Sequence, residues 1–158
     1  MRYGHIVRRA RAERPDYNAL KSLWQTTVAA YAKKQGLPAR AATWRFPVST
    51  SWRFYEPDAH RDPDGIAGGA RKLILDGLVM AGVLPTDTHR HVGRTRWEEF
   101  YVGATSENGA RVEGVSVGLY EGEAIAGVLV VPAKLPDLNE LLAARELGAR
   151  RSKAVTRG

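Results

Sequence analysis

Three aspartates and a lysine in the middle of this 158-residue chain have the types and spacing that metal-assisted chemistry requires. Asp62 and Asp64 are separated by one proline, and residues two apart in an extended segment share a side. Asp87 follows an apolar segment in which Lys72 lies four residues before Asp76. Carboxylates that lie close together repel each other unless a cation sits between them. The pattern therefore suits a hard divalent cation such as Mg²⁺.

Such a site suits phosphodiester hydrolysis, because Mg²⁺ takes one or two protein carboxylates together with waters and phosphate oxygens. Lys72 shares a helix face with Asp76, and near a metal it would bind the scissile phosphate or orient the attacking water. The alternative is a solvated turn of the usual turn residues, with Asp64 as a helix N-cap and a surface Lys72–Asp76 pair. Spacing alone leaves both interpretations open.

The composition indicates a folded domain with a polyanionic partner. The chain is 44% hydrophobic and 26% charged, with a formal net charge of +7, which favours nucleic acid or an anionic membrane surface. Basic residues outnumber acidic ones in residues 1–53 and 142–158, and acidic ones dominate residues 54–141. No apolar run is long enough to span a membrane. The lack of cysteine excludes disulfides, thiolate zinc sites and cysteine nucleophiles, and fits a cytoplasmic setting.

Hydrophobic periodicity and turn residues predict the order of secondary structure. We expect strands at residues 3–9, 43–55, 94–103, 111–120 and 124–132, and helices at residues 17–35, 66–82 and 138–150. Asp16 and Asp137 are the expected caps of the first and last helices, and Gly82 should end the middle one. The Asn108-Gly109 pair predicts a hairpin between the strands on either side of it.

These elements indicate a mixed α/β (α+β) fold, with a β-α-β-α-β-β core whose mixed sheet is packed by helices, plus a C-terminal extension. We place one domain at residues 1–122 and the extension, with a strand, a helix and a basic tail, at residues 123–158, packed on the same domain. The middle helix is apolar over most of its circumference, so it should be buried on more than one side, and one side could face a second subunit.

Two other groups of residues receive structural interpretations. His89 and His91 are close together, but without cysteine or a longer fixed spacing we expect them to be solvent-exposed and not a zinc site. The large aromatic residues alternate along the predicted strands, so we expect most of them in the core and not stacked on bases; they are Trp44, Trp52, Trp97 and Phe100.

The segment from Arg61 to Asp87 resembles the signature of the RusA family of Holliday-junction resolvases. The family pattern is approximately R-D-x-D-N, a helix lysine, D-x-L-x-x-A-G and an aspartate after a short loop. This chain has R-D-P-D-G from Arg61, then Lys72, then D-G-L-V-M-A-G from Asp76, then Asp87. Gly65 stands where the family has asparagine, and Thr86 where an acid often precedes the last aspartate. The resemblance covers about half of the chain.

The resemblance implies a homodimeric, Mg²⁺-dependent endodeoxyribonuclease of phage or prophage type, acting in the cytoplasm of a bacterial host. It implies that Asp62, Asp64 and Asp87 hold the metal and are catalytic together with Lys72. Mn²⁺ is the alternative metal. The expected DNA contacts come from basic residues in and before this segment, namely Arg61, Lys72, Arg71, Arg53 and Arg45.

Our sequence-based hypothesis is an enzyme that resolves Holliday junctions and other branched DNA by paired phosphodiester hydrolysis during recombination and repair, with no membrane partner. Two subunits would place two sites on opposed strands. Two alternatives stay open. One is a family member that binds branched DNA with weak or no cleavage. The other is a basic phage structural protein associated with DNA, in which the aspartates are turn residues.

Overall fold

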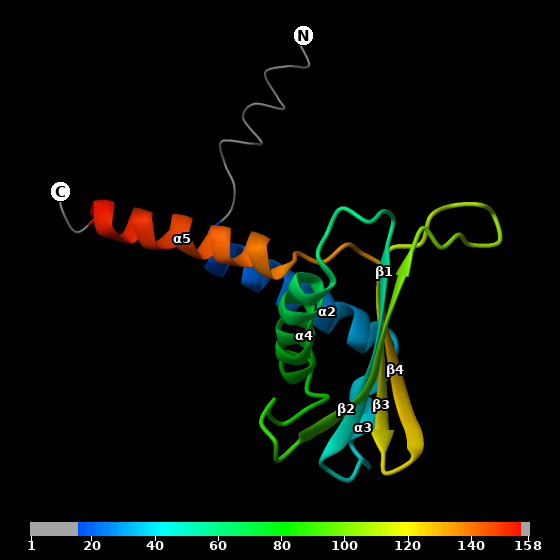
Figure 1. Ribbon diagram of the computed structural model, residues 1–158. Coiled ribbons are helices and arrows are strands. Elements are labelled where there is room, and N and C mark those ends of the chain that lie inside the picture. The colour runs from blue at the N-terminus through cyan, green and yellow to red at the C-terminus, as the bar shows by residue number, and fades with distance from the viewer. Residues whose placement is uncertain (1–15, 156–158) are drawn as a thin grey trace.

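A computed structural model describes residues 16–155 of the chain (Figure 1). The order of elements is α2 (Tyr17–Lys34), α3 (Leu37–Ala41), β1 (Val48–Glu56), α4 (Pro63–Met80), β2 (Val92–Val102), β3 (Gly114–Glu121), β4 (Ala124–Val131) and α5 (Leu138–Val155). The strand expected at residues 3–9 lies outside the described residues. No helix in the described part of the chain is long and apolar enough to cross a membrane.

The four strands form one mixed sheet in the order β2-β1-β3-β4, which confirms the mixed α+β class. β1 pairs with β2 in parallel and with β3 antiparallel, and β3 pairs antiparallel with β4. Parallel neighbours need a crossover connection, and α4 provides it between β1 and β2. Residues 123–155 contribute β4 to this sheet and α5 to the helical layer.

The helices lie on one side of the sheet, and the core lies between the two layers (Figure 1). Alternate residues of β1 point into this core, where Trp52 and Phe54 are fully buried, and Ile74 and Leu78 of α4 pack in the same cluster. The intervening β1 residue Arg53 is exposed on the other side of the sheet. Helix α5 packs against α2 and α4 and extends beyond the body of the molecule.

The predicted caps are confirmed. The Asp16 carboxylate accepts a hydrogen bond from the N–H of Ala19 at 2.9 Å, and Asp137 accepts one from the N–H of Glu140 at 2.8 Å. Gly82 has a φ of 79° directly after the end of α4, the left-handed conformation that favours glycine there. These short-range hydrogen bonds depend on neighbouring residues only, which is why the sequence predicts them.

Two other expectations were wrong. The second strand begins at Val48 and not at residue 43, because residues 37–41 form helix α3, in whose first turn Pro38 is favoured, and residues 42–47 form a turn and a loop. The expected hairpin between β2 and β3 does not form, since these strands lie on opposite sides of β1. The turn itself forms within the loop between the two strands, where Thr105 and Arg111 make an isolated bridge and Gly109 has a φ of 82°.

Helices α2 and α4 approach each other closely at Gly77. A Cβ atom at this position would lie 2.5 Å from the Cβ of Val28, which is fully buried in α2. Only glycine permits this contact, because the Cβ of Val28 is attached directly to the backbone of a packed helix and cannot move aside easily. Gly77 therefore fixes the position of α4 against the rest of the helical layer.

We expect Gly77→Ala to destabilise the protein by about 1–3 kcal/mol, because the added methyl group overpacks the α2–α4 contact. Gly68→Ala is the matched control on the same helix: its Cβ would meet only Leu138 Cδ2, at 3.8 Å. The control should be neutral, or stabilising by up to about 1 kcal/mol through helix propensity. Urea unfolding followed by circular dichroism measures both, and equal effects would contradict the close contact.

Candidate functional site

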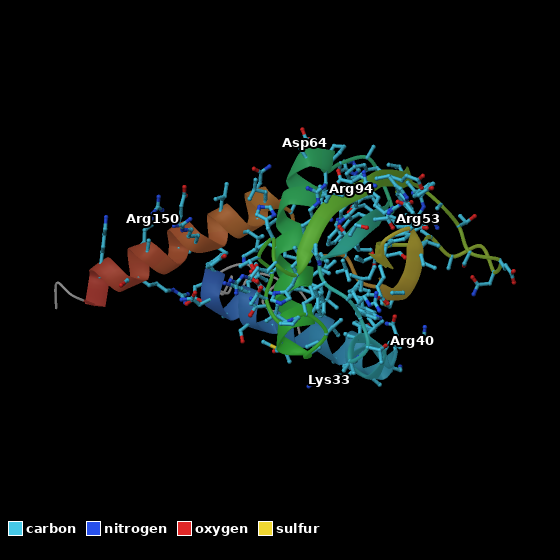
Figure 2. The ribbon with its side chains drawn as sticks, turned by 90° about the horizontal axis from the view of Figure 1, so that it is seen from below. Lys33, Arg40, Arg53, Asp64, Arg94 and Arg150 are labelled. Carbon is cyan, nitrogen blue, oxygen red and sulfur yellow. The ribbon has the colours of Figure 1, made fainter. Side chains whose placement is uncertain are left out.

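The aspartates of the Asp62-Pro63-Asp64 segment form the start of helix α4. Asp62 is extended, with φ −70° and ψ 126°, as expected for a residue before proline. Its carboxylate accepts a hydrogen bond from the N–H of Gly65 at 3.3 Å, so Asp62, and not Asp64, is the N-cap. Asp64 lies in the first turn and is exposed at this end of the helix (Figure 2). A negative charge there is favoured by the helix dipole.

The side chain of the preceding residue, Arg61, is largely buried and not directed to solvent. Its guanidinium binds both carboxylate oxygens of Glu56 at the end of β1, with Nε to Oε2 at 3.1 Å, and also donates to the carbonyl oxygen of Leu135. The side chains of Arg61 and Glu56 are each only 8% exposed. This ion pair ties the start of α4 to the sheet and to the segment before α5. A phosphate contact would require Arg61 to leave Glu56.

A second cluster lies about two turns further along α4. The ammonium of Lys72 is 2.7 Å from Asp87 Oδ2 and 3.0 Å from Asp76 Oδ1, so it joins two carboxylates. Gln25 of α2 donates to the other oxygen of Asp76 at 3.0 Å, and Lys21 lies 3.9 Å from it. The side chain of Asp76 is 16% exposed and that of Asp87 is 32% exposed, so the cluster is open to solvent.

The electrostatics of this cluster follow from the shared ammonium. Hydrogen bonds to Asp87 and Asp76 raise the pKa of Lys72 above its ordinary value. The hydrogen bond from Lys72 holds the pKa of Asp87 below its ordinary value, although partial burial acts in the opposite direction. Lys72 and Asp87 are therefore both charged at neutral pH.

Asp87 is held in place by the loop that connects α4 to β2. The Thr86 hydroxyl lies 2.7 Å from that of Thr88 and 2.6 Å from Nδ1 of His91, and the carbonyl of Thr88 accepts the N–H of Val92 at 2.9 Å. These bonds brace the loop on both sides of Asp87. His91 thus has a structural partner, while His89 is exposed as expected.

The structure brings Lys72 and Asp87 together but separates them from Asp62 and Asp64. Eight residues of α-helix between Asp64 and Lys72 correspond to about 12 Å along the axis. Among residues 16–155, no group of three or more His, Asp or Glu side chains is placed to hold a metal ion. Asp76 is the cluster member that we did not assign to the site from sequence, although its i,i+4 spacing from Lys72 indicated the contact.

The other basic residues expected to contact DNA lie on different elements. Arg71 of α4 pairs with Glu98 of β2, and burial lowers the pKa of its guanidinium. Arg53 lies 5.1 Å over the ring of Trp97 and 3.5 Å from Glu99, on the sheet face opposite the helices. Arg45 is exposed in the loop before β1. The labelled cations of Figure 2 are likewise distributed over several elements.

Comparison with known proteins identified no relative: no family model, no curated protein and no solved structure matches the chain.

We expect Arg61→Met to destabilise the protein by about 3 kcal/mol, because it leaves the buried carboxylate of Glu56 without its cation. The matched control is Arg53→Met, which breaks an ion pair with Glu99 in which both side chains are nearly half exposed. The control should cost less than about 1 kcal/mol. Chemical unfolding of both variants checks this, and a small effect of Arg61→Met would mean that its guanidinium is free for another role.

The Lys72–Asp87 pair should make stability depend on pH at both extremes. A carboxylate with a lowered pKa stabilises the fold above its ordinary value of 3.8, and this contribution is lost as pH falls through the folded pKa. A lysine with a raised pKa stabilises below 10.5, and its contribution is lost as pH rises through the folded pKa. Asp87→Asn should therefore cost up to about 1 kcal/mol at pH 7, reduced by solvent screening.

That difference between wild type and Asp87→Asn should shrink below about pH 4 and at strongly alkaline pH. Thermal unfolding of both proteins across the pH range measures it. A difference that stays constant down to pH 2 would contradict the ion pair.

Proposed function

We propose that the protein is a divalent-metal-dependent endodeoxyribonuclease that cleaves four-way junctions and other branched DNA, in the manner of the RusA-type resolvases that its sequence resembles. The observation that carries this proposal is the solvent-open cluster of Lys72 with Asp76 and Asp87. Two carboxylates and an ammonium on one exposed surface are the groups that hydrolysis of a phosphodiester uses. The net charge of +7 supports a DNA substrate.

The donor set fits Mg²⁺ or Mn²⁺ with Asp76 and Asp87 as protein ligands. Both carboxylates contact the Lys72 ammonium, so they face one cation position, which the ammonium would leave when a metal binds. Mg²⁺ is commonly held by one or two carboxylates, with waters and substrate phosphate completing its shell. When bound, the metal would polarise the phosphate and lower the pKa of a water. Gln25 orients the Asp76 carboxylate from the opposite side.

Lys72 would bind and stabilise the phosphate. Its side chain is 56% exposed, so the ammonium has room to contact a non-bridging phosphate oxygen. A fixed positive charge there would neutralise the charge that develops on the phosphate in the transition state. Its raised pKa keeps Lys72 protonated at neutral pH, so we assign it to charge stabilisation and not to general-base chemistry.

The geometry supports separate roles for Asp62 and Asp64. Asp62 caps α4 and positions the helix that carries Lys72 and Asp76. Asp64 is exposed at the same end. The resemblance places both in the metal site with Asp87, and that assignment stays a prediction. We keep the homodimer in the proposal, because symmetrical cleavage of a four-way junction needs two opposed sites.

Cleavage of a synthetic four-way junction in the presence of Mg²⁺ or Mn²⁺ tests the proposal. We expect the wild-type protein to cut two opposed strands, and Asp76→Asn and Asp87→Asn each to lower the rate at least 100-fold. Lys72→Met should lower the rate with little change in junction binding. Asp58→Asn, which changes an acid outside the cluster whose side chain is 41% exposed, is the matched control and should retain full activity.

The alternatives give distinct outcomes. Tight binding of the junction without cleavage would identify a branched-DNA-binding protein and contradict the enzyme. Neither binding nor cleavage would favour a structural role. If Asp62→Asn and Asp64→Asn abolish cleavage while Asp76→Asn does not, the active site lies at the start of α4 and the assignment to the Asp76–Asp87 pair is wrong.

A further inference from the structure

The side chain of Gln35 occupies the place of a fifth strand at one position of the sheet. β4 is the outer strand, and its outer edge is not paired with another strand of the described residues. The Gln35 amide donates to the carbonyl oxygen of Val130 at 2.8 Å and accepts the N–H of Val130 at 2.9 Å. This is the pair of hydrogen bonds that a neighbouring strand would make. The backbone of Val130 therefore points outward from the sheet.

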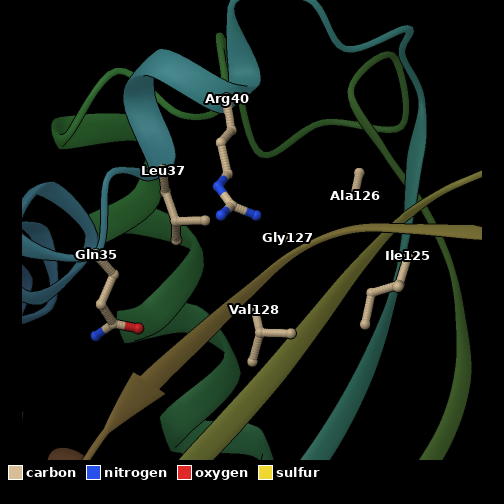
Figure 3. Close-up of a pocket in the computed structure, with 7 residues that line it drawn as sticks. All are labelled: Gln35, Leu37, Arg40, Ile125, Ala126, Gly127 and Val128. Atoms are coloured by element: carbon tan, nitrogen blue, oxygen red, sulfur yellow. The ribbon is translucent and has the colours of Figure 1, made fainter.

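Two residues earlier, the equivalent place beside Val128 is open. Because outward and inward backbone groups alternate along a strand, and Val128 and Val130 lie in one unbroken register opposite Gly118 and Ser116, the N–H and C=O of Val128 also point outward. A pocket of about 290 Å³ adjoins this edge, lined by α3, Gln35 and β4 (Figure 3). No side chain among residues 16–155 makes a hydrogen bond to the backbone of Val128.

An unpaired cation extends from α3 towards this pocket. The side chain of Arg40 points towards β4 in Figure 3 and lines the pocket with Leu37. Among the described residues Arg40 has no ion pair and no side-chain hydrogen bond. The backbone that carries Arg40 is fixed, because α3 and the residues after it pack tightly against β4. A Cβ at Gly127 would lie 2.9 Å from Leu37 Cδ2 and 3.0 Å from Trp44 Cζ2. The edge thus combines free backbone groups and a positive charge.

We propose that the edge of β4 at Val128 binds an extended acidic peptide segment of a partner protein, which adds a short fifth strand beside Gln35. The peptide residue opposite Val128 would exchange two backbone hydrogen bonds with it, as Gln35 does with Val130. Directly opposed residues point to the same face, so that residue's side chain lies on the side away from the helices. Its neighbours point towards α3, where a carboxylate meets Arg40.

A peptide series tests this inference independently of any nuclease activity. The probe is dye-labelled Thr-Val-Glu-Val-Thr-Val with blocked ends, and binding is followed by fluorescence anisotropy. The same peptide with Lys in place of Glu should bind about tenfold more weakly, because it loses a charge-assisted hydrogen bond. N-methylation of the two residues that flank the Glu should abolish binding, because it removes the backbone donors. Hydrogen exchange should show new protection of the Val128 amide.

Matched variants separate the charge from the fold. Arg40→Gln should weaken the Glu peptide about tenfold, and Arg40→Glu should reverse the preference in favour of the Lys peptide. Arg150→Gln, which removes an exposed arginine of α5, should change neither. Absence of binding, equal binding of the Glu and Lys peptides, or binding unaffected by N-methylation would overturn the proposal. A further contrary result would be a dimer, weakened by Arg40→Glu, in which the Val128 amide is protected from hydrogen exchange without any peptide. A second copy of the chain would then occupy the edge.

Discussion

The length of helix α4 is the constraint on which the rest of the structure depends. The helix crosses from the end of β1 to the start of β2, and its two ends are therefore far apart. Arg61 and Glu56 fix its start, and the contact of Gly77 with Val28 fixes its second half. Asp62 and Asp64 lie at the start, while the loop after the helix returns Asp87 to Lys72. This rigid helix thus separates aspartates that the sequence motif assigns to one site.

Local features of this fold could be predicted from the sequence, and features that depend on distant segments could not. The caps at Asp16 and Asp137 and the turn at Gly82 need only their neighbours, and all three are present. The Asn108-Gly109 turn also forms, but no local rule shows that β1 comes to lie between β2 and β3. α3 was missed because a proline that ends one helix also favours the first turn of the next.

In the candidate site, too, contacts between near neighbours could be predicted from the sequence and contacts between distant segments could not. The helical spacing of Lys72 and Asp76 predicts their contact, and the structure contains it. The burial of Arg61 depends on Glu56 and on Leu135, far along the chain, so the same arginine looked like a phosphate ligand in the sequence. Gln35 likewise acquires its role only when β4 lies beside the end of α2. The two proposed surfaces, on α4 and at the edge of β4, use different residues and are independent.

The central proposal is that a divalent cation binds at Asp76 and Asp87, whereas the resemblance predicts a metal held by Asp62 and Asp64 at the start of α4 together with Asp87. Paramagnetic broadening of backbone amide signals by substoichiometric Mn²⁺ tests it most directly, because the effect falls steeply with distance and the two candidate positions are about 12 Å apart along the helix. We predict that the strongest broadening is centred on Lys72, Asp76 and Asp87 and disappears in Asp87→Asn. Broadening centred on Asp62 and Asp64, or none that is localised, would contradict the account.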